Sequence, residues 1–501
     1  MKKIISFAVC ALMCSSAAFA GTSNEAELET EVKAEKKEKQ KKPVTYNEKG
    51  EIIKTGINLG PLPVVAFDAD RGFQYGALLN IYNFGDGSTY PNPKSWWYIE
   101  ASAYTGGTWN LYLNYDNREI FKNTRLSICT QYSNEAALDF YGFNGYQSIY
   151  TYALEDYFAN NPEEFTFDTD NKKGEKALAK FKDKGKAPMG FYRYSRQSFK
   201  AKADLTGKIA PNFYWEGGYS FYWINHKEFT PVGYTPADGS LYSLYRDWGI
   251  LNDTGENQFV SALKAGLMYD SRNVENNPTK GIWAEAHAIY APKWLGSSMN
   301  SFKVSATFRQ YVPLYKDKLV FAYRLAYQGF LGKETPWYLM PFYSNMGYNR
   351  DFDAIGGYRT VRGLMLNRVQ GLDVGYFNAE FRYRFIDFKL AKQNIAFALS
   401  AFCDGAHVFR GYDMTFTDSA KAALLSLDPA KNPAGDALRG IAMTNQYDHF
   451  VFNKKDGFHG AAGAGLRFIM NQNFIVAFEY ARCFNKQDGN GAFYINTGFL
   501  F

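Results

Sequence analysis

One arginine has a setting that suggests a specific charged contact rather than ordinary solvation. Arg362 lies between Val361 and Gly363 in the stretch GGYRTVRGL, which begins with Gly356 and Gly357. A guanidinium group is planar and can bind a carboxylate through two parallel hydrogen bonds. If Arg362 is shielded from water, it therefore needs an acidic partner from another part of the chain.

Other residues that could carry chemistry form weaker patterns. Glu285 and His287 are two residues apart in a strand-like segment, so they share a face and could act as a hydrolytic pair. However, the chain has only five histidines, and no G-x-S-x-G motif occurs. His407, His449 and His459 gather around a long link, where metal capture is a still weaker hypothesis. We predict no enzyme, no catalytic residue, no metal and no cofactor.

The first twenty residues have the pattern of a secretory signal peptide. A positive start precedes the apolar run 4–13, and Ala18 and Ala20 frame a cleavage site. The apolar run is too short for a membrane-spanning helix, which needs about 20 residues. A lipoprotein is the weaker alternative, because the residues before Cys14 make a poor lipobox. We therefore assign residues 1–20 to a signal peptide.

The composition narrows the class of the exported protein. The net charge is only +6 over 501 residues, and no basic patch suggests nucleic acid. Aromatic residues make up 18% of the chain, with 42 Phe and 38 Tyr beside 44 Gly. Residues 21–59 are rich in charge and are predicted to form a periplasmic linker. The remainder fits either a soluble secreted all-β protein or an outer-membrane β-barrel, whose alternating strands do not stand out as long apolar runs.

Residues 377–387, FNAEFRYRFID, show the alternation most clearly. Phe377, Phe381 and Phe385 point one way, whereas Glu380 and Arg382 point the other way. In a soluble sandwich the apolar face would pack a core. In a membrane barrel it would face lipid, and the polar face would line a wet lumen.

Counting such runs predicts sixteen strands in residues 60–501. Their expected ranges are 61–68, 72–84, 96–106, 108–116, 124–133, 192–209, 213–226, 259–270, 280–291, 301–313, 319–330, 373–387, 395–408, 459–470, 474–481 and 491–501. The longest links all join an odd strand to the next even strand; they are 134–191, 227–258, 331–372 and 409–458. Long links at one end, short links at the other and an even strand number are typical of outer-membrane barrels. We predict an all-β fold, a 16-stranded antiparallel transmembrane barrel.

The link that contains Arg362 is the sixth on the extracellular side. It is over forty residues long and rich in aromatics, which favours a functional loop over a disordered one. Folded inward, it would fill a lumen that is otherwise wide. The alternation places Asp404 and Glu380 on the luminal face of their strands. Asp404 and Glu380 are therefore the two candidate partners of Arg362.

Several segments then show a family resemblance in the same order along the chain. They are MPFYSNMGYNRDFDAIGGYRTVRGL, LKAGLMYDSRNVENNPTKGIWAEAH, ALDFYGFNG, VGYFNAEFRYRF, FALSAFCDGAHVF and HGAAGAGLRF. Together they resemble the BamA/TamA outer-membrane barrel superfamily, also called bacterial surface antigens. The resemblance implies that Arg362 enters the barrel and bonds Asp404, with Glu380 as a second partner. Two departures are Leu364, where the family has an aromatic residue, and Gly405, which lies one place early.

The resemblance also implies a function. The family inserts, assembles or translocates protein, or lipid, at the outer membrane through a weak seam between the first and last strands. Residues 21–59 are too short for the family's polypeptide-transport-associated (POTRA) repeats, so we expect a barrel-only member. The expected location is the cell outer membrane, and the expected partners are its lipid, lipopolysaccharide and client proteins. Phe499 and Phe501 are the predicted assembly signal. A structural or ligand-binding surface barrel, or a porin, is the alternative, and the oligomeric state stays open.

Overall fold

A computed structural model gives the fold, and not every residue of the chain is described. The described residues are 46, 52–68, 71–148, 165–167, 172, 175, 192–229, 234–236, 241–247, 249–253, 255–275, 277–332, 335–348, 350–353, 355–390, 393–414, 456–471, 474–497 and 501. The signal peptide predicted at 1–20 and most of the linker predicted at 21–59 lie outside them. In the described part, no helix has the length and apolar character needed to cross a membrane.

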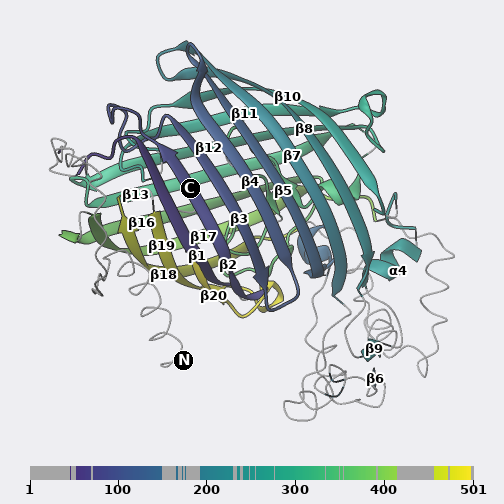
Figure 1. The fold of residues 1–501 in the computed structure, drawn as a ribbon. Coiled ribbons are helices and arrows are strands. Elements are labelled where there is room, and N and C mark those ends of the chain that lie inside the picture. The colour runs from purple at the N-terminus through teal and green to yellow at the C-terminus, as the bar shows by residue number, and fades with distance from the viewer. Residues whose placement is uncertain are drawn as a thin grey trace, which may run out of the picture.

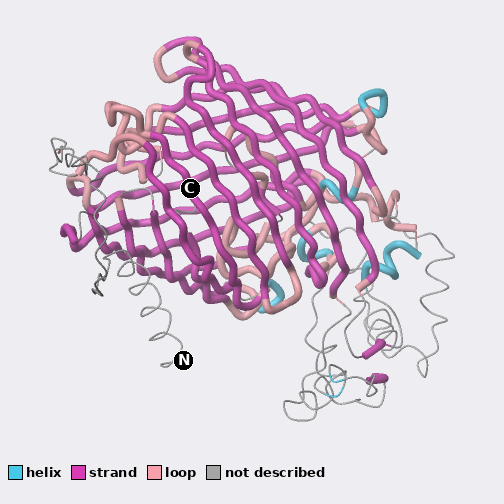
Figure 2. The backbone as a smooth tube through the Cα atoms, viewed as in Figure 1, coloured by secondary structure: helices cyan, strands magenta, loops and turns pink. Residues whose placement is uncertain are grey.

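Sixteen antiparallel strands form a closed barrel, in which each strand pairs with its neighbours along the chain (Figures 1 and 2). Strands β1 and β20 meet where the barrel closes. The strands are β1 (Ile57–Asp68), β2 (Gly72–Asn83), β3 (Ser95–Tyr104), β4 (Trp109–Phe121), β5 (Thr124–Asp139), β7 (Arg193–Ala210), β8 (Phe213–Glu228), β10 (Gln258–Asp270), β11 (Gly281–Ala291), β12 (Ser301–Tyr315), β13 (Leu319–Leu331), β16 (Asp373–Leu390), β17 (Gln393–Arg410), β18 (His459–Met470), β19 (Phe474–Cys483) and β20 (Ala492–Thr497). The predicted fold class and strand number are therefore confirmed.

Small elements lie in the links between the barrel strands. They are the helix α4 (Leu241–Asp247), the strand pairs β6 (Phe165–Phe167) with β9 (Tyr234–Pro236) and β14 (Phe342–Tyr343) with β15 (Phe352–Asp353), and the 3-10 turns η1 (Gly145–Gln147), η3 (Lys293–Leu295), η4 (Trp337–Leu339) and η5 (Lys486–Asp488). The pair β14 and β15 belongs to the link between β13 and β16, which carries Arg362.

Burial follows the alternation expected for a membrane barrel. Phe381 of β16 and Leu399 of β17 point outward and are about half exposed, at 49% and 50%. In the same two strands, Glu380 and Asp404 point inward and are fully buried. The outward face is thus apolar and suited to lipid, whereas the polar face is covered from within.

The last strand differs from the prediction at residue 501. A strand was expected over 491–501, with Phe501 in line on one face; β20 is described over Ala492–Thr497, and residues 498–500 lie outside the described residues. Phe501 lies inside the barrel, where it is 8% exposed and packs with Tyr311 and Ala322 of β12 and β13. Phe499 lies outside the described residues, so the predicted assembly signal stays a prediction.

Candidate functional site: an arginine held inside the barrel

The loop that carries Arg362 turns back on itself just before the arginine. Gly357 donates its backbone N–H to the carbonyl of Leu364 over 2.9 Å, and Gly356 donates to the hydroxyl of Thr360, also over 2.9 Å. Gly356 has φ of +119°, and a Cβ there would lie only 2.0 Å from the carbonyl oxygen of Met365. Only glycine fits this position, which explains why the turn begins with the motif glycines.

Arg362 is completely buried and binds three wall carboxylates. Its Nε and Nη2 donate to the two oxygens of Asp404 over 2.7 and 3.0 Å, and its backbone N–H donates to the same carboxylate over 3.1 Å. Its Nη1 donates to Glu380 over 2.8 Å and to Glu479 over 2.7 Å. The guanidinium also lies over the ring of Phe402, 3.4 Å from its centroid. The predicted contacts with Asp404 and Glu380 are therefore present.

Two further arginines balance the charge of this cluster. Arg382 binds Glu380 over 3.0 Å, and Arg467 binds Glu380 and Glu479 over 2.9 and 2.7 Å. The guanidinium groups of Arg362, Arg382 and Arg467 thus share three carboxylates. We call these three arginines, together with Asp404, Glu380 and Glu479, the loop lock. Burial alone would lower the pKa of Arg362, but Asp404 and then the two glutamates raise it well above its ordinary value. The three carboxylates thus favour the charged form of Arg362.

The residues beside Arg362 pack the loop against the wall. Val361 and Leu364 are fully buried in one apolar cluster. Gly363 has φ of +98° and donates its N–H to the hydroxyl of Tyr494 over 3.1 Å. A Cβ on this glycine would lie 3.0 Å from the Cβ atoms of two wall alanines. The close approach of loop and wall therefore requires a glycine here.

The same loop is anchored to the opposite side of the barrel by two aspartates. Asp353 binds Lys200 of β7 over 2.7 Å, and Asp351 lies 3.7 Å from Lys202 of the same strand. Tyr222 of β8 also donates its hydroxyl to Asp351. Since Arg362 binds β16, β17 and β19, the loop between β13 and β16 crosses the bore from wall to wall.

Sequence analysis does not identify Glu479 and Arg467, which complete the loop lock. Both lie in predicted strands, 474–481 and 459–470, and both point inward. Glu479 stands between Phe478 and Tyr480 in an otherwise apolar strand. The sequence did contain a signal for Glu479. When an acid lies between two aromatic residues in an alternating strand, the aromatics face lipid and the acid must face the lumen.

The weaker sites suggested by the sequence have structural partners. Glu285 binds Arg309 over 3.0 Å, and His287 lies 3.2 Å from the carbonyl oxygen of Ser344 in the loop. Glu285 therefore contacts the neighbouring strand, and His287 contacts the loop inside the barrel. His407 and His459 lie near Asp456, whereas His449 is outside the described residues. Within the described part of the chain, no cluster of three or more histidine, cysteine and acidic residues could hold a metal ion.

A closed barrel of sixteen alternating strands, with a long loop bound inside it, defines an outer-membrane β-barrel protein. The family model of the Omp85 superfamily domain matches residues 126–501, which is more than half of the chain. The protein therefore belongs to the Omp85 superfamily, and this membership implies an outer-membrane location.

Solved structures give a more distant likeness. BamA from Haemophilus ducreyi lacking POTRA domains 1–3 is 16% identical, with a TM-score of 0.46, over 91% of this chain and 74% of that chain. CdiB from Escherichia coli is 11% identical, with a TM-score of 0.47, over 89% of this chain and 63% of that chain. CdiB from Acinetobacter baumannii is 12% identical, with a TM-score of 0.43, over 90% and 61%. The chain thus spans less than two thirds of either CdiB chain. No curated protein matches it.

Proposed function

We propose that this barrel inserts, assembles or translocates client protein or lipid at the outer membrane by opening its wall between β1 and β20. Membership of the Omp85 superfamily supports the general role. The loop lock supports a route through the wall and not along the bore. The loop is held on two sides of the barrel, so it leaves little room for a client to pass along the barrel axis. In this proposal the barrel is not an enzyme, and membrane lipid and lipopolysaccharide surround its apolar face.

One observation carries the proposal. Among the described residues, β1 and β20 are joined by a single pair of facing residues, Phe67 and Ile495. On its other side, β1 faces β2 through twelve consecutive pairs. Each backbone hydrogen bond contributes about 0.5–1.5 kcal/mol. Among the described residues, this junction, which we call the seam, is therefore the weaker side of β1.

A disulfide across the seam tests whether the wall must open. Phe67→Cys with Ile495→Cys would link facing residues, and antiparallel partners of this kind lie within reach of a disulfide. In a deletion strain, the oxidised variant should fail to restore outer-membrane protein and lipid composition, and reductant should restore its activity. The matched control is Val65→Cys with Tyr75→Cys, which links β1 to β2 and leaves the seam free. Full activity of the oxidised seam variant would refute lateral opening.

A further inference from the structure

The pairing of β1 with β2 fixes which residues of β1 face the seam. Phe84 donates its N–H to the carbonyl of Gly56 over 2.9 Å, so the backbone polar groups of Gly56 point toward β2. The register then runs without a shift from Ile57 to Asp68. Because these groups alternate sides along a strand, even-numbered residues bond β2 and odd-numbered residues face the seam.

Two prolines occupy this seam-facing edge. Pro61 and Pro63 are both odd-numbered, and their side chains are exposed on the outer face of β1. Proline has no N–H, so neither residue can donate to a neighbouring strand. A strand that added here would leave two of its backbone carbonyls without a hydrogen-bond donor. The hydrocarbon core of the membrane offers no water to bond them, so strand addition is disfavoured.

The C-terminal residue agrees with this reading of the edge. Counting outward from the pair Phe67 and Ile495, a straight β20 would place residue 499 opposite Pro63 and residue 501 opposite Pro61. Phe501 is instead inside the barrel. Its carbonyl accepts a hydrogen bond from Arg382 over 3.0 Å, and its ring lies 6.4 Å from that of Tyr311.

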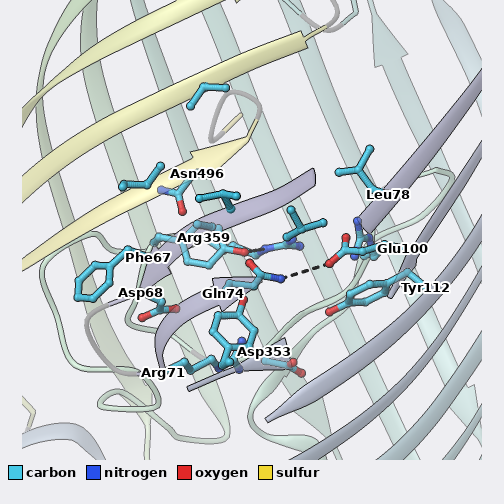
Figure 3. Close-up of a pocket in the computed structure, with 18 of the residues that line it drawn as sticks. Phe67, Asp68, Arg71, Gln74, Leu78, Glu100, Tyr112, Asp353, Arg359 and Asn496 are labelled. Atoms are coloured by element: carbon cyan, nitrogen blue, oxygen red, sulfur yellow. Dashed lines mark hydrogen bonds between the residues drawn. The ribbon is translucent and has the colours of Figure 1, made fainter. Parts of the chain in front are cut away.

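A cavity of about 140 Å³ lies behind the same edge. It is bounded by β1 from Leu62 to Asp68, by Phe474 of β19 and by Ile495 of β20, and it reaches inward to β2, β3 and the loop. In Figure 3, Phe67 and Asn496 lie on the seam side of this space, whereas Glu100 and Tyr112 lie across it. The cavity therefore connects the seam with the polar interior.

Two cations line the cavity without a carboxylate at salt-bridge distance. In the described part of the chain, no carboxylate lies within 4.0 Å of the guanidinium of Arg350 or Arg359. Arg359 donates to the hydroxyl of Tyr358 over 2.9 Å, and Arg350 lies over the ring of Tyr112, 3.9 Å from its centroid. Figure 3 shows Arg359 in the middle of the labelled lining residues.

Glu100 and Asp353, two of the four acids in the lining, are already engaged. Glu100 accepts hydrogen bonds from Gln74 and Ser102 over 3.2 and 2.6 Å, and Asp353 binds Lys200 over 2.7 Å. Arg350 and Arg359 can therefore offer hydrogen-bond donors to something that enters the cavity. Guanidinium groups bind phosphate oxygens well, because their paired donors match the anion's geometry.

We propose that the seam cavity binds a phospholipid with an anionic head group, whose phosphate contacts Arg350 and Arg359 and whose acyl chains leave between β1 and β20. The apolar residues Pro63, Phe67 and Ile495 border this exit. A lipid tail needs no hydrogen bond from the proline edge, whereas a client strand does. This inference rests on the proposed function in taking the seam as the route, and it names the class of molecule that occupies it.

Photolabelling of the purified full-length barrel tests this inference. The barrel is reconstituted in phosphatidylcholine vesicles that contain a minor amount of photoactivatable phosphatidylglycerol, and labelled peptides are mapped by mass spectrometry. We expect strong labelling of residues around the seam in the wild type. Arg350→Gln with Arg359→Gln should reduce it about tenfold, as expected when charged hydrogen bonds to one phosphate are lost, and Lys at both positions should restore part of it.

Two controls make the test decisive. Photoactivatable diacylglycerol with the same acyl chains carries no phosphate and should label the seam much less, whereas equal labelling would overturn the role of the arginines. Pro61→Val with Pro63→Val restores two donors. When a β-strand peptide is added, this variant should lose lipid labelling that the wild type keeps, because the peptide can then pair at this edge. A photoactivatable β-strand peptide that labels residues 59–65 of the wild type better than the lipid does would also overturn the proposal. Labelling requires no transport, so its outcome is independent of the seam disulfide experiment.

Discussion

The loop lock and the seam are built in opposite ways within one barrel. At the loop lock, Arg362 makes five hydrogen bonds to three carboxylates and every charge has a partner of opposite sign. At the seam, one residue pair joins β1 to β20 among the described residues, and two prolines remove donors from the edge. Side chains from distant parts of the chain thus hold the bore closed, whereas among the described residues the backbone pairing of the wall is sparsest between β1 and β20.

This difference suggests how a closed barrel can still have an opening. The wall must keep its hydrogen bonds in the membrane, because unpaired backbone groups are costly there. A barrel can have fewer backbone hydrogen bonds at one junction only if other contacts preserve its shape. The loop that crosses the bore provides this support, since it ties β7 to β16, β17 and β19.

The largest expected effect comes from removing the central cation. Arg362→Ala leaves Asp404 buried without its main partner, which should cost about 3–5 kcal/mol of folding free energy. The variant should lose heat resistance in gel-shift assays of the folded barrel, and its single-channel conductance should rise as the loop is released. Arg359→Ala, three residues earlier, is the matched control and should change stability little. If the two variants lose the same folding stability, the loop lock does not stabilise the barrel more than a neighbouring arginine does.

The partner relation should appear in a double-mutant cycle. Asp404→Ala and Arg362→Ala remove the same contacts, so the double variant should be little worse than either single variant. We expect a coupling energy of about 2–3 kcal/mol between the two positions. Measured denaturation midpoints of the four proteins give this value. Additive losses would mean that the two side chains stabilise the barrel independently.

A smaller loss is expected at the contact between loop and wall. Gly363→Ala places a Cβ 3.0 Å from two wall alanines and imposes a side chain at φ of +98°. The strain should cost about 1–3 kcal/mol and lower the thermal midpoint. Gly296→Ala is the control, because φ there is +102° but nothing lies within 4 Å of the added Cβ. If both substitutions lower the midpoint equally, backbone strain rather than loop packing is the cause.

The smallest effect concerns pH at the periplasmic turn between β10 and β11. Burial would raise the pKa of Glu275, but Arg125 and Arg118 outweigh it and lower this pKa from 4.5 to about 2. A depressed carboxyl pKa contributes stability that is complete above pH 4.5 and is lost as pH falls toward 2. Glu275→Gln should therefore be less stable than the wild type at pH 7 and nearly equal to it near pH 2. A difference that does not change with pH would exclude this ion pair as the cause.

Local pattern was enough to predict most of the wall. Alternation and link length are properties of neighbouring residues, so the sixteen strands and the luminal phase of Glu380 and Asp404 follow from the sequence. The contact of Arg362 with Asp404 came from these phases together with the family resemblance. Glu479 was missed although its strand was predicted, because nothing local says which of several inward acids the loop reaches.

The seam could not be predicted in the same way. Pro61 and Pro63 are visible in the sequence, but whether they face β2 or β20 depends on the register of β1 with β2. The inward position of Phe501 depends on Arg382 and Tyr311, which lie more than a hundred residues away. Such contacts are set by the closure of the whole barrel rather than by any single strand.

Hydrogen–deuterium exchange of the barrel in lipid nanodiscs tests the contrast between seam and loop lock most directly. The account predicts that backbone amides of β20 on its seam-facing edge exchange much faster than those of β16 and β17, which flank Arg362. Arg362→Ala should bring the amides of β16 and β17 closer to the fast rate. Equal and strong protection of β20 and β17 in the wild type would contradict the account.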